Sequence, residues 1–389
     1  MIALHMRLAP CLLVVLLLLA MAPASGRSET KVTPSIGLRT TYDDNTLGKG
    51  DADFEFLLSP AVKVEGGSEV TRYGLQGGVD VYQYAEDDDY NRENVRLGAN
   101  VSHSVTERLV LRLGGSWSRD HTVETEFDES GLTTDNVARN LFRVTPGLTV
   151  RLTERDDITL DTSLGLMRYE RSGYTDYQTG GLTTNWSHML GDGLWRIIGQ
   201  AGAQAYRFDR SNGQTTQLVL STLGGFAWKA SELLEFQALA GISQTRSDVE
   251  FDMGPDMDDS RLTFSGSLSA TWTDEIWRLT VSADRSESPS TYGELMTRDR
   301  LRTSFGRNLS EYLYLGTQLA WYKSSTTGLV RSENTQTYSF GPTMRYRLSE
   351  DFVVDGGYLY VHENDVDTDA TTDRNRFYIN FTKEFPFLK

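Results

Sequence analysis

Apolar and polar side chains alternate along residues 109–117, LVLRLGGSW, and this alternation constrains the fold more than any other feature of the sequence. Leu111 and Trp117 fall on one parity, whereas Arg112 and Ser116 fall on the other. Successive side chains of a β-strand point to opposite faces, so the segment predicts a strand with an apolar face and a charged face. The fold then depends on which of these faces meets water.

The same alternation recurs along the chain, and short turns that contain Glu or Asp alternate with longer polar stretches. The short turns repeat at intervals of about 40 residues or a multiple of it, as expected for a repeated hairpin unit. This spacing predicts an up-and-down antiparallel sheet of about 18 strands, with 16 as the alternative because the eighth and fourteenth strands alternate weakly. The predicted strands are 32–42, 53–64, 70–84, 94–105, 108–120, 137–152, 157–171, 177–190, 194–208, 215–229, 233–247, 260–272, 276–287, 295–307, 312–323, 335–348, 352–363 and 374–387.

A sheet of this size is expected to close on itself, because closure removes the unpaired edge strands that invite aggregation. A soluble barrel would turn the apolar row inward, but about 18 strands enclose far more space than side chains can fill. A charged lumen and an apolar exterior in contact with lipid resolve the mismatch. The sequence therefore predicts an all-β transmembrane barrel with short periplasmic turns and longer extracellular loops. A soluble β-sandwich or propeller is the alternative.

The tryptophans provide a separate indication, because aromatic girdles of such barrels lie on the lipid side near the strand ends. All seven fall on the apolar parity, and Trp186 lies deeper in its strand than the others. The expected girdle residues are Trp117, Trp195, Trp228, Trp272, Trp277 and Trp321.

The N-terminus has the features of a secretory signal peptide: a single arginine, an apolar run and then small residues. The expected organisation is a signal peptide over 1–24 with cleavage near Ala24 to Gly26, a short segment over 25–31 and the barrel over 32–389. Cys11 is the only cysteine and lies inside the leader, so no disulfide or cysteine-based metal site is expected in the mature chain. The net charge of −16 argues against a nucleic-acid partner.

The chain ends in an alternating strand with apolar residues at 377, 379, 381, 385 and 387. It resembles the C-terminal strand that the outer-membrane assembly machinery recognises, although Leu-Lys follows the last aromatic residue. We therefore expect a Gram-negative outer membrane, with membrane lipid, lipopolysaccharide and this machinery as partners.

Several predicted strands also carry a small residue followed by proline on the apolar parity, as in Thr33-Pro34, Ser59-Pro60, Thr145-Pro146 and Gly341-Pro342. Together with the acidic-turn hairpins, this pattern resembles the β-barrel porin 2 group of outer-membrane proteins. The resemblance covers the whole mature chain and rests on patterns, without catalytic residues to carry over. It implies a role in exopolysaccharide export, with the polymer and periplasmic export proteins as further partners.

The charged parity is rich in arginine, whose planar guanidinium suits carboxylates and sugar hydroxyls. We therefore expect a channel whose arginine-rich lumen passes an exopolysaccharide, and a diffusion porin for small solutes is the alternative. Pairing with acids such as Asp161, Glu235, Asp284, Asp355 and Glu384 would leave these arginines a packing role instead. The candidate lumen residues are Arg39, Arg96, Arg112, Arg143, Arg151, Arg196, Arg278, Arg302, Arg345, Arg347 and Arg376.

Three further possibilities bear on function. A porin often narrows its pore with one inward loop, and His121–Asn136 is the best candidate by length.

An enzyme would need a nucleophile beside a histidine and an acid, but Ser102 and His103 have opposite parity, as do Ser187 and His188, so no catalytic residues are expected. A structural or adhesive barrel could bind Ca²⁺ through its acidic loops 248–259 and 364–373, but neither has the ligand spacing of a calcium loop, so no metal or cofactor is expected.

Overall fold

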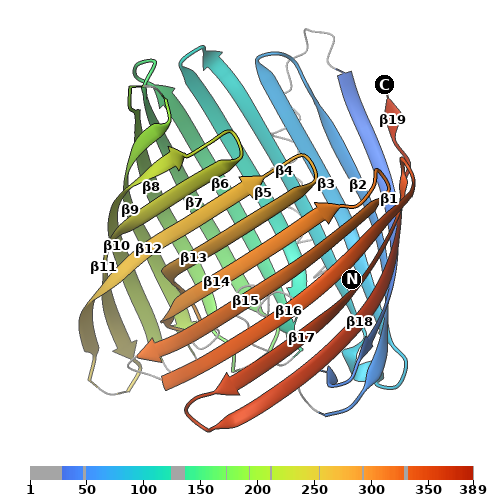
Figure 1. Cartoon of the computed structure of the whole chain (residues 1–389). Coiled ribbons are helices and arrows are strands. Elements are labelled where there is room, and N and C mark those ends of the chain that lie inside the picture. Colours follow the sequence, from blue (N-terminus) through green and yellow to red (C-terminus); the bar gives the residue numbers. More distant parts are fainter. Residues whose placement is uncertain are drawn as a thin grey trace, which may run out of the picture.

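The computed structural model describes residues 29–46, 50–123, 136–171, 173–191, 193–210, 213–253, 255–290, 293–327 and 332–388. These residues form one antiparallel sheet in which each strand pairs with the next along the chain. The sheet is a closed 18-strand barrel, with the long loops at the bottom of Figure 1 and the short turns at the top.

The strands of the barrel wall are β1 (Glu29–Asp43), β2 (Asp53–Gly67), β3 (Thr71–Tyr84), β4 (Arg92–Thr106), β5 (Leu109–His121), β6 (Ala138–Arg151), β7 (Asp156–Tyr169), β8 (Asp176–Met189), β9 (Trp195–Arg210), β10 (Gly213–Lys229), β11 (Leu234–Phe251), β12 (Met257–Thr273), β13 (Trp277–Pro289), β14 (Leu295–Asn308), β15 (Leu313–Thr327), β16 (Ser332–Ser349), β17 (Phe352–Asp365) and β18 (Ala370–Glu384). A short 3₁₀ helix, η2 (Asp88–Tyr90), lies between β3 and β4, and β19 (Phe387–Leu388) follows β18. No helix in the described ranges is long and apolar enough to cross a membrane.

The barrel closes where β1 pairs with β18. Ser35–Asp43 pair with Arg376–Glu384, and beyond them β19 pairs with Lys31 and Val32. Closure supplies ladder partners to the two strands that would otherwise be the edges of the sheet. The prediction of an all-β, up-and-down barrel is confirmed, and so is the count of 18 rather than 16 strands.

The two parities face opposite sides of the wall as the alternation predicts. Inward side chains of β1, β2, β4 and β14–β18 line a common cavity of about 890 Å³, so this parity faces the lumen. The opposite parity carries exposed apolar side chains, among them Leu38, Leu319 and Phe377, which are 52%, 49% and 52% exposed. Such a surface is stable only against an apolar medium, so the outer face matches the hydrocarbon of a bilayer.

One hairpin, β13–β14, separates from β12 toward the long loops while β14 stays paired with β15. The ladder between β12 and β13 joins Gly266–Thr273 to Arg278–Arg285 and ends there, although both strands continue toward the long loops. β13 stays paired with β14 as far as Pro289 and Leu295. In Figure 1, β12 and β13 diverge toward the long-loop edge. The weak alternation of the predicted fourteenth strand marks this departure, because the end of β14 no longer separates lipid from lumen.

A pair of arginine substitutions on adjacent residues of β15 tests the orientation of the wall. Leu319→Arg places a charge on the outer face near the middle of the strand and should destabilise the barrel by about 2–4 kcal/mol. Gln318→Arg projects into the 890 Å³ cavity and should change stability far less. Urea unfolding in phospholipid vesicles measures both, and equal losses would contradict the assigned faces.

Candidate functional site

The lumen is basic although the whole chain is acidic. Five of the eleven arginines predicted to face it line the cavity of about 890 Å³, and six of the eleven pair with acids on other strands. Arg112 pairs with Asp161 at 2.9 Å, and Arg345 pairs with Asp355 at 2.5 Å. The other pairs are Arg39 with Glu55 at 3.2 Å, Arg96 with Asp80, Arg151 with Asp157 at 3.6 Å and Arg376 with Asp43 at 3.5 Å.

The five other predicted lumen arginines have no acid partner among the ion pairs given above. The guanidinium of Arg302 lies over the ring of Tyr322, 5.3 Å from its centroid. The four others are exposed to the lumen, and none pairs with an acid within the described residues. They are Arg143, Arg196, Arg278 and Arg347. Together they give part of the lumen wall an uncompensated positive charge.

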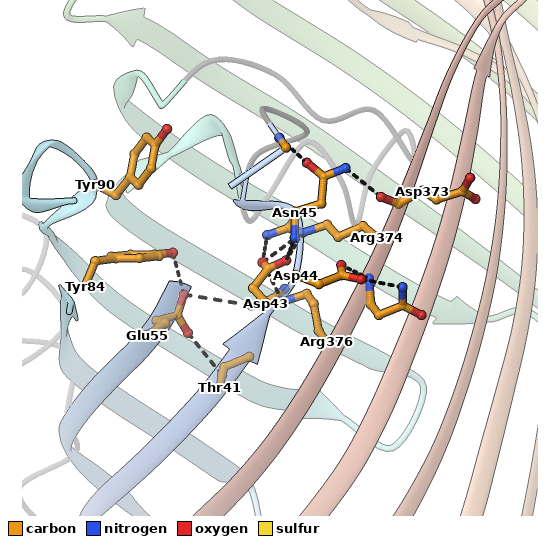
Figure 2. A network of polar contacts seen from close by, with 12 residues as sticks. Thr41, Asp43, Asp44, Asn45, Glu55, Tyr84, Tyr90, Asp373, Arg374 and Arg376 are labelled. Carbon is orange, nitrogen blue, oxygen red and sulfur yellow. Dashed lines mark hydrogen bonds and ion pairs between the residues drawn. The ribbon is translucent and has the colours of Figure 1, made fainter. Parts of the chain in front are cut away.

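A buried carboxylate cluster lies on the inner wall near the long loops (Figure 2). The carboxylate of Glu55 on β2 is only 2% exposed and lies 3.2 Å from Arg39 and 3.3 Å from Arg92. It also accepts a hydrogen bond of 2.8 Å from the hydroxyl of Tyr84. Arg376 of β18 is 3.8 Å away, so the cluster joins β18, β1, β2, β3 and β4 across the inner surface.

A second set of contacts, which we call the closure clasp, joins the ends of β1 and β18 on the long-loop side, at and beyond the last ladder pair, Asp43 and Arg376 (Figure 2). The buried carboxylate of Asp43 accepts hydrogen bonds of 2.9 and 3.0 Å from Nε of Arg374. The side chain of Asp44 accepts from the backbone and the side-chain amide of Asn375 at 2.7 and 2.6 Å. Asn45 donates to the main-chain oxygen of Asp373 at 2.6 Å. The clasp extends the seam between the first and last strands beyond the ladder.

The hairpin formed by β13 and β14 folds into the lumen and docks on the inner wall. The N–H of Leu295 donates to Gln217 of β10 at 2.9 Å. The carboxylate of Glu287 accepts from Arg261 at 3.0 Å, from Thr263 at 3.3 Å and from Thr245. Residues 293–298 are consecutively buried, as expected for a segment covered on both sides. The hairpin therefore fills part of the barrel cross-section near the long loops.

This inward hairpin was not the predicted one. The loop His121–Asn136 was the sequence candidate for narrowing the pore, but its central residues 124–135 lie outside the described residues. The sequence does contain one indication of the hairpin over residues 285–299, which the sequence analysis did not use. Arg285, Glu287 and Asp299 are charged although they fall on the apolar parity. The prediction also missed Arg92 and Arg374, which bind the buried carboxylates, because they lie at strand ends where the boundaries are least certain.

The predicted girdle tryptophans lie on the outer face. Trp195 stacks on Trp228 with ring centroids 5.0 Å apart, and Trp272 contacts Trp277 at 5.1 Å. These four lie near the short turns, whereas Trp117 and Trp321 lie toward the long loops. The positions match two aromatic belts, and their role at the membrane interface stays a prediction.

The histidines lie on separate strands, and three of them contact the strand next to their own. His103 bonds Thr71, His188 bonds Asp156 and His362 bonds Asp373, each at 2.8 Å. Within the described residues, no group of three or more His, Cys, Asp or Glu side chains could hold a metal ion.

Comparison with known proteins supports the fold. No protein-family model matches the sequence, and no curated protein matches it either. The ferric citrate transporter FecA superimposes with a TM-score of 0.51 at 9% identity, over 87% of this chain and 60% of FecA. OccAB2 of Acinetobacter baumannii gives 0.48 at 12% identity over 93% and 98% of the two chains. OpdK of Pseudomonas aeruginosa gives 0.48 at 9% identity over 92% and 99%.

The likeness to FecA is one of fold alone. The closed sheet, its apolar exterior and its charged interior define the class as an outer-membrane β-barrel. Membership of the β-barrel porin 2 group stays a prediction, because no family model matches.

The closure clasp yields a test of stability. Asp43→Asn leaves Arg374 at the seam without its buried counter-charge, which should cost about 3–5 kcal/mol. The temperature at which the folded barrel converts to the unfolded form on SDS gels should fall. Asp367→Asn, at an exposed position in the turn between β17 and β18, is the matched control and should leave this temperature unchanged.

Proposed function

We propose that the protein is a passive channel for small solutes in the outer membrane of a Gram-negative bacterium, with a preference for anions. The observation that carries this proposal is the combination of an arginine-rich lumen with a hairpin that folds into it. The arginines raise the local concentration of anions, and the hairpin limits the size of what passes.

The hairpin also bears on exopolysaccharide export, the function that the sequence led us to expect. A polysaccharide needs a continuous wide path, but Glu287 and Leu295 hold the hairpin across the inner wall, and the Glu55 cluster occupies the wall near β1 and β2. These contacts favour small solutes over a polymer chain. Exopolysaccharide export has no observation of its own in the structure or in the comparisons.

The distribution of exposed arginines in the lumen is consistent with passive transport. The exposed arginines of the lumen lie on several strands, so a solute meets many weak contacts rather than one tight site. Conduction requires binding that is favourable enough for entry and weak enough for release. Nothing in this arrangement needs a catalytic step, and the similar FecA is a transporter.

Ion selectivity tests the proposal. Replacing Arg112, Arg143 and Arg196 together with glutamine removes three lumen charges and leaves Asp161 without its partner. The ratio of chloride to potassium permeability should fall, and the reversal potential in a salt gradient should shift toward that of a cation-selective pore. The measurement is made on single channels in planar bilayers.

Arg155→Gln, in an exposed short turn between β6 and β7, is the control for a change of charge away from the lumen. Its reversal potential should equal that of the wild type. A folded wild-type barrel that carries no current would overturn the channel proposal, and an unchanged reversal potential in the triple variant would overturn the role of the arginines.

A further inference from the structure

The inner wall of the barrel carries a large recess on one side. Side chains of β1, β2, β4 and β14–β18 line a cavity of about 890 Å³, which we call the basic recess. Along β1 the recess extends from Thr41, near the long loops, to Ser35, toward the short turns. Its volume lies in the range of about 300–1,000 Å³ that is usual for small-molecule sites. The recess is therefore large enough to hold a solute during its passage.

The inward hairpin leaves this side of the lumen open. The β13–β14 hairpin docks on Gln217 of β10, Thr245 of β11 and Arg261 of β12. Because β1 and β10 are nine strands apart in a closed barrel of 18, they lie on opposite sides of it. A solute that passes the hairpin therefore moves along the wall that carries the basic recess.

Arginine dominates the charge at the surface of the recess. The lining contains five arginines and only one carboxylate, that of Asp355. Arg345 pairs with Asp355, whereas Arg347, two positions farther along β16, has no acid partner within the described residues. The acids that pair with the three other arginines do not belong to the lining. These three arginines are Arg39, Arg96 and Arg376. A solute in the recess therefore meets a basic surface.

Neutral hydrogen-bonding side chains lie among these arginines. Tyr314 faces Arg345 across the ladder between β15 and β16, and Gln318 and Tyr378 also line the recess. The side chains of Tyr314, Gln318 and Tyr378 have no hydrogen-bond partner among the residues that the structure describes. Hydroxyl and amide groups both donate and accept hydrogen bonds, as the hydroxyl groups of a sugar do. The recess therefore offers groups for a polyhydroxylated ligand beside its positive charge.

The combination suits a solute that joins a compact, doubly charged anion to several hydroxyl groups. A phosphomonoester carries about −1.5 to −2 charge at pH 7 and three strong acceptor oxygens. The planar fork of arginine matches phosphate geometry and donates several hydrogen bonds. A single carboxylate carries less charge and has only two oxygens. Guanidinium groups as close in the sequence as those of Arg345 and Arg347 therefore favour the phosphate.

We propose that the basic recess selects phosphorylated sugars, with Arg345 and Arg347 binding the phosphate and the neutral side chains binding the sugar hydroxyls. This inference rests on the proposed channel and names the substrate class of its lumen. Binding in a conducting pore has to allow release, and a recess that is open to the lumen and lined by exposed arginines permits it.

Block of single-channel current by glucose 6-phosphate tests the substrate class. The wild-type barrel conducts potassium chloride in a planar bilayer while the sugar phosphate is titrated into the bath. We expect a saturable loss of current, with a half-blocking concentration several-fold lower than those of glucuronate and methyl phosphate. Glucuronate keeps the sugar hydroxyls but carries a carboxylate, and methyl phosphate carries the charge without the sugar.

Each comparison can overturn one part of the proposal. A half-blocking concentration equal to that of glucuronate would overturn the preference for phosphate, and one equal to that of methyl phosphate or of inorganic phosphate would overturn the role of the sugar. A barrel that conducts and is not blocked by glucose 6-phosphate would overturn the site and leave the proposed channel intact.

A pair of variants locates the site. Arg347→Gln removes one guanidinium from the recess and should raise the half-blocking concentration of glucose 6-phosphate several-fold. Arg72→Gln, on the inward parity of β3 near the short turns, removes the same charge outside the recess and is the matched control. It should leave the half-blocking concentration unchanged, and an equal rise in both variants would contradict a local site.

Equilibrium dialysis of the detergent-solubilised barrel against radiolabelled glucose 6-phosphate measures binding without current. Saturable binding that Arg347→Gln weakens and Arg72→Gln does not would support the recess. A barrel that binds the sugar phosphate in this way and carries no current would overturn the proposed channel and not the site. The two proposals can therefore fail separately.

Discussion

The need to pair every main-chain N–H and C=O inside a bilayer is the constraint on which this structure depends. A sheet meets it only by closing on itself, so β1 has to find β18 at the end of the chain. The ladder between these strands is shorter than that between β1 and β2, and the closure clasp adds buried charge pairs and amide contacts beyond it. The closure clasp thus lies at the seam that completes the barrel.

Charge in the lumen follows from the same constraint. Because the outer parity is committed to lipid, polar side chains have only the inner parity and the loops to occupy. Some inner arginines are neutralised in place, as Arg112 is by Asp161, and others such as Arg143 and Arg196 are not. The neutralised pairs stiffen the wall, whereas the others leave a positive field in the path of a solute. In the proposed channel, one wall therefore serves both stability and selectivity.

Much of this architecture could be predicted from the alternation alone, because a period of two residues fixes the face of every side chain once one face is known. The strand count follows from it, and the same parity predicts inward arginines and outward tryptophans. The inward hairpin does not, because its path depends on contacts between Glu287, Leu295 and distant strands that no local pattern encodes. The only sequence feature that marks the hairpin is the charged Arg285 on the apolar parity. It indicates where β13 separates from β12, but it does not predict the strands on which the hairpin docks.

The central claim is that the charged parity is wet and the apolar parity is in lipid, and thiol accessibility measures it most directly. Cys11 is the only cysteine and lies outside the barrel strands, so single cysteines at positions 110–117 of β5, in a Cys11→Ala background, can be probed in intact vesicles with a charged, water-soluble maleimide. The account predicts labelling at 110, 112, 114 and 116 and protection at 111, 113, 115 and 117. The opposite alternation, or uniform labelling along the strand, would contradict it.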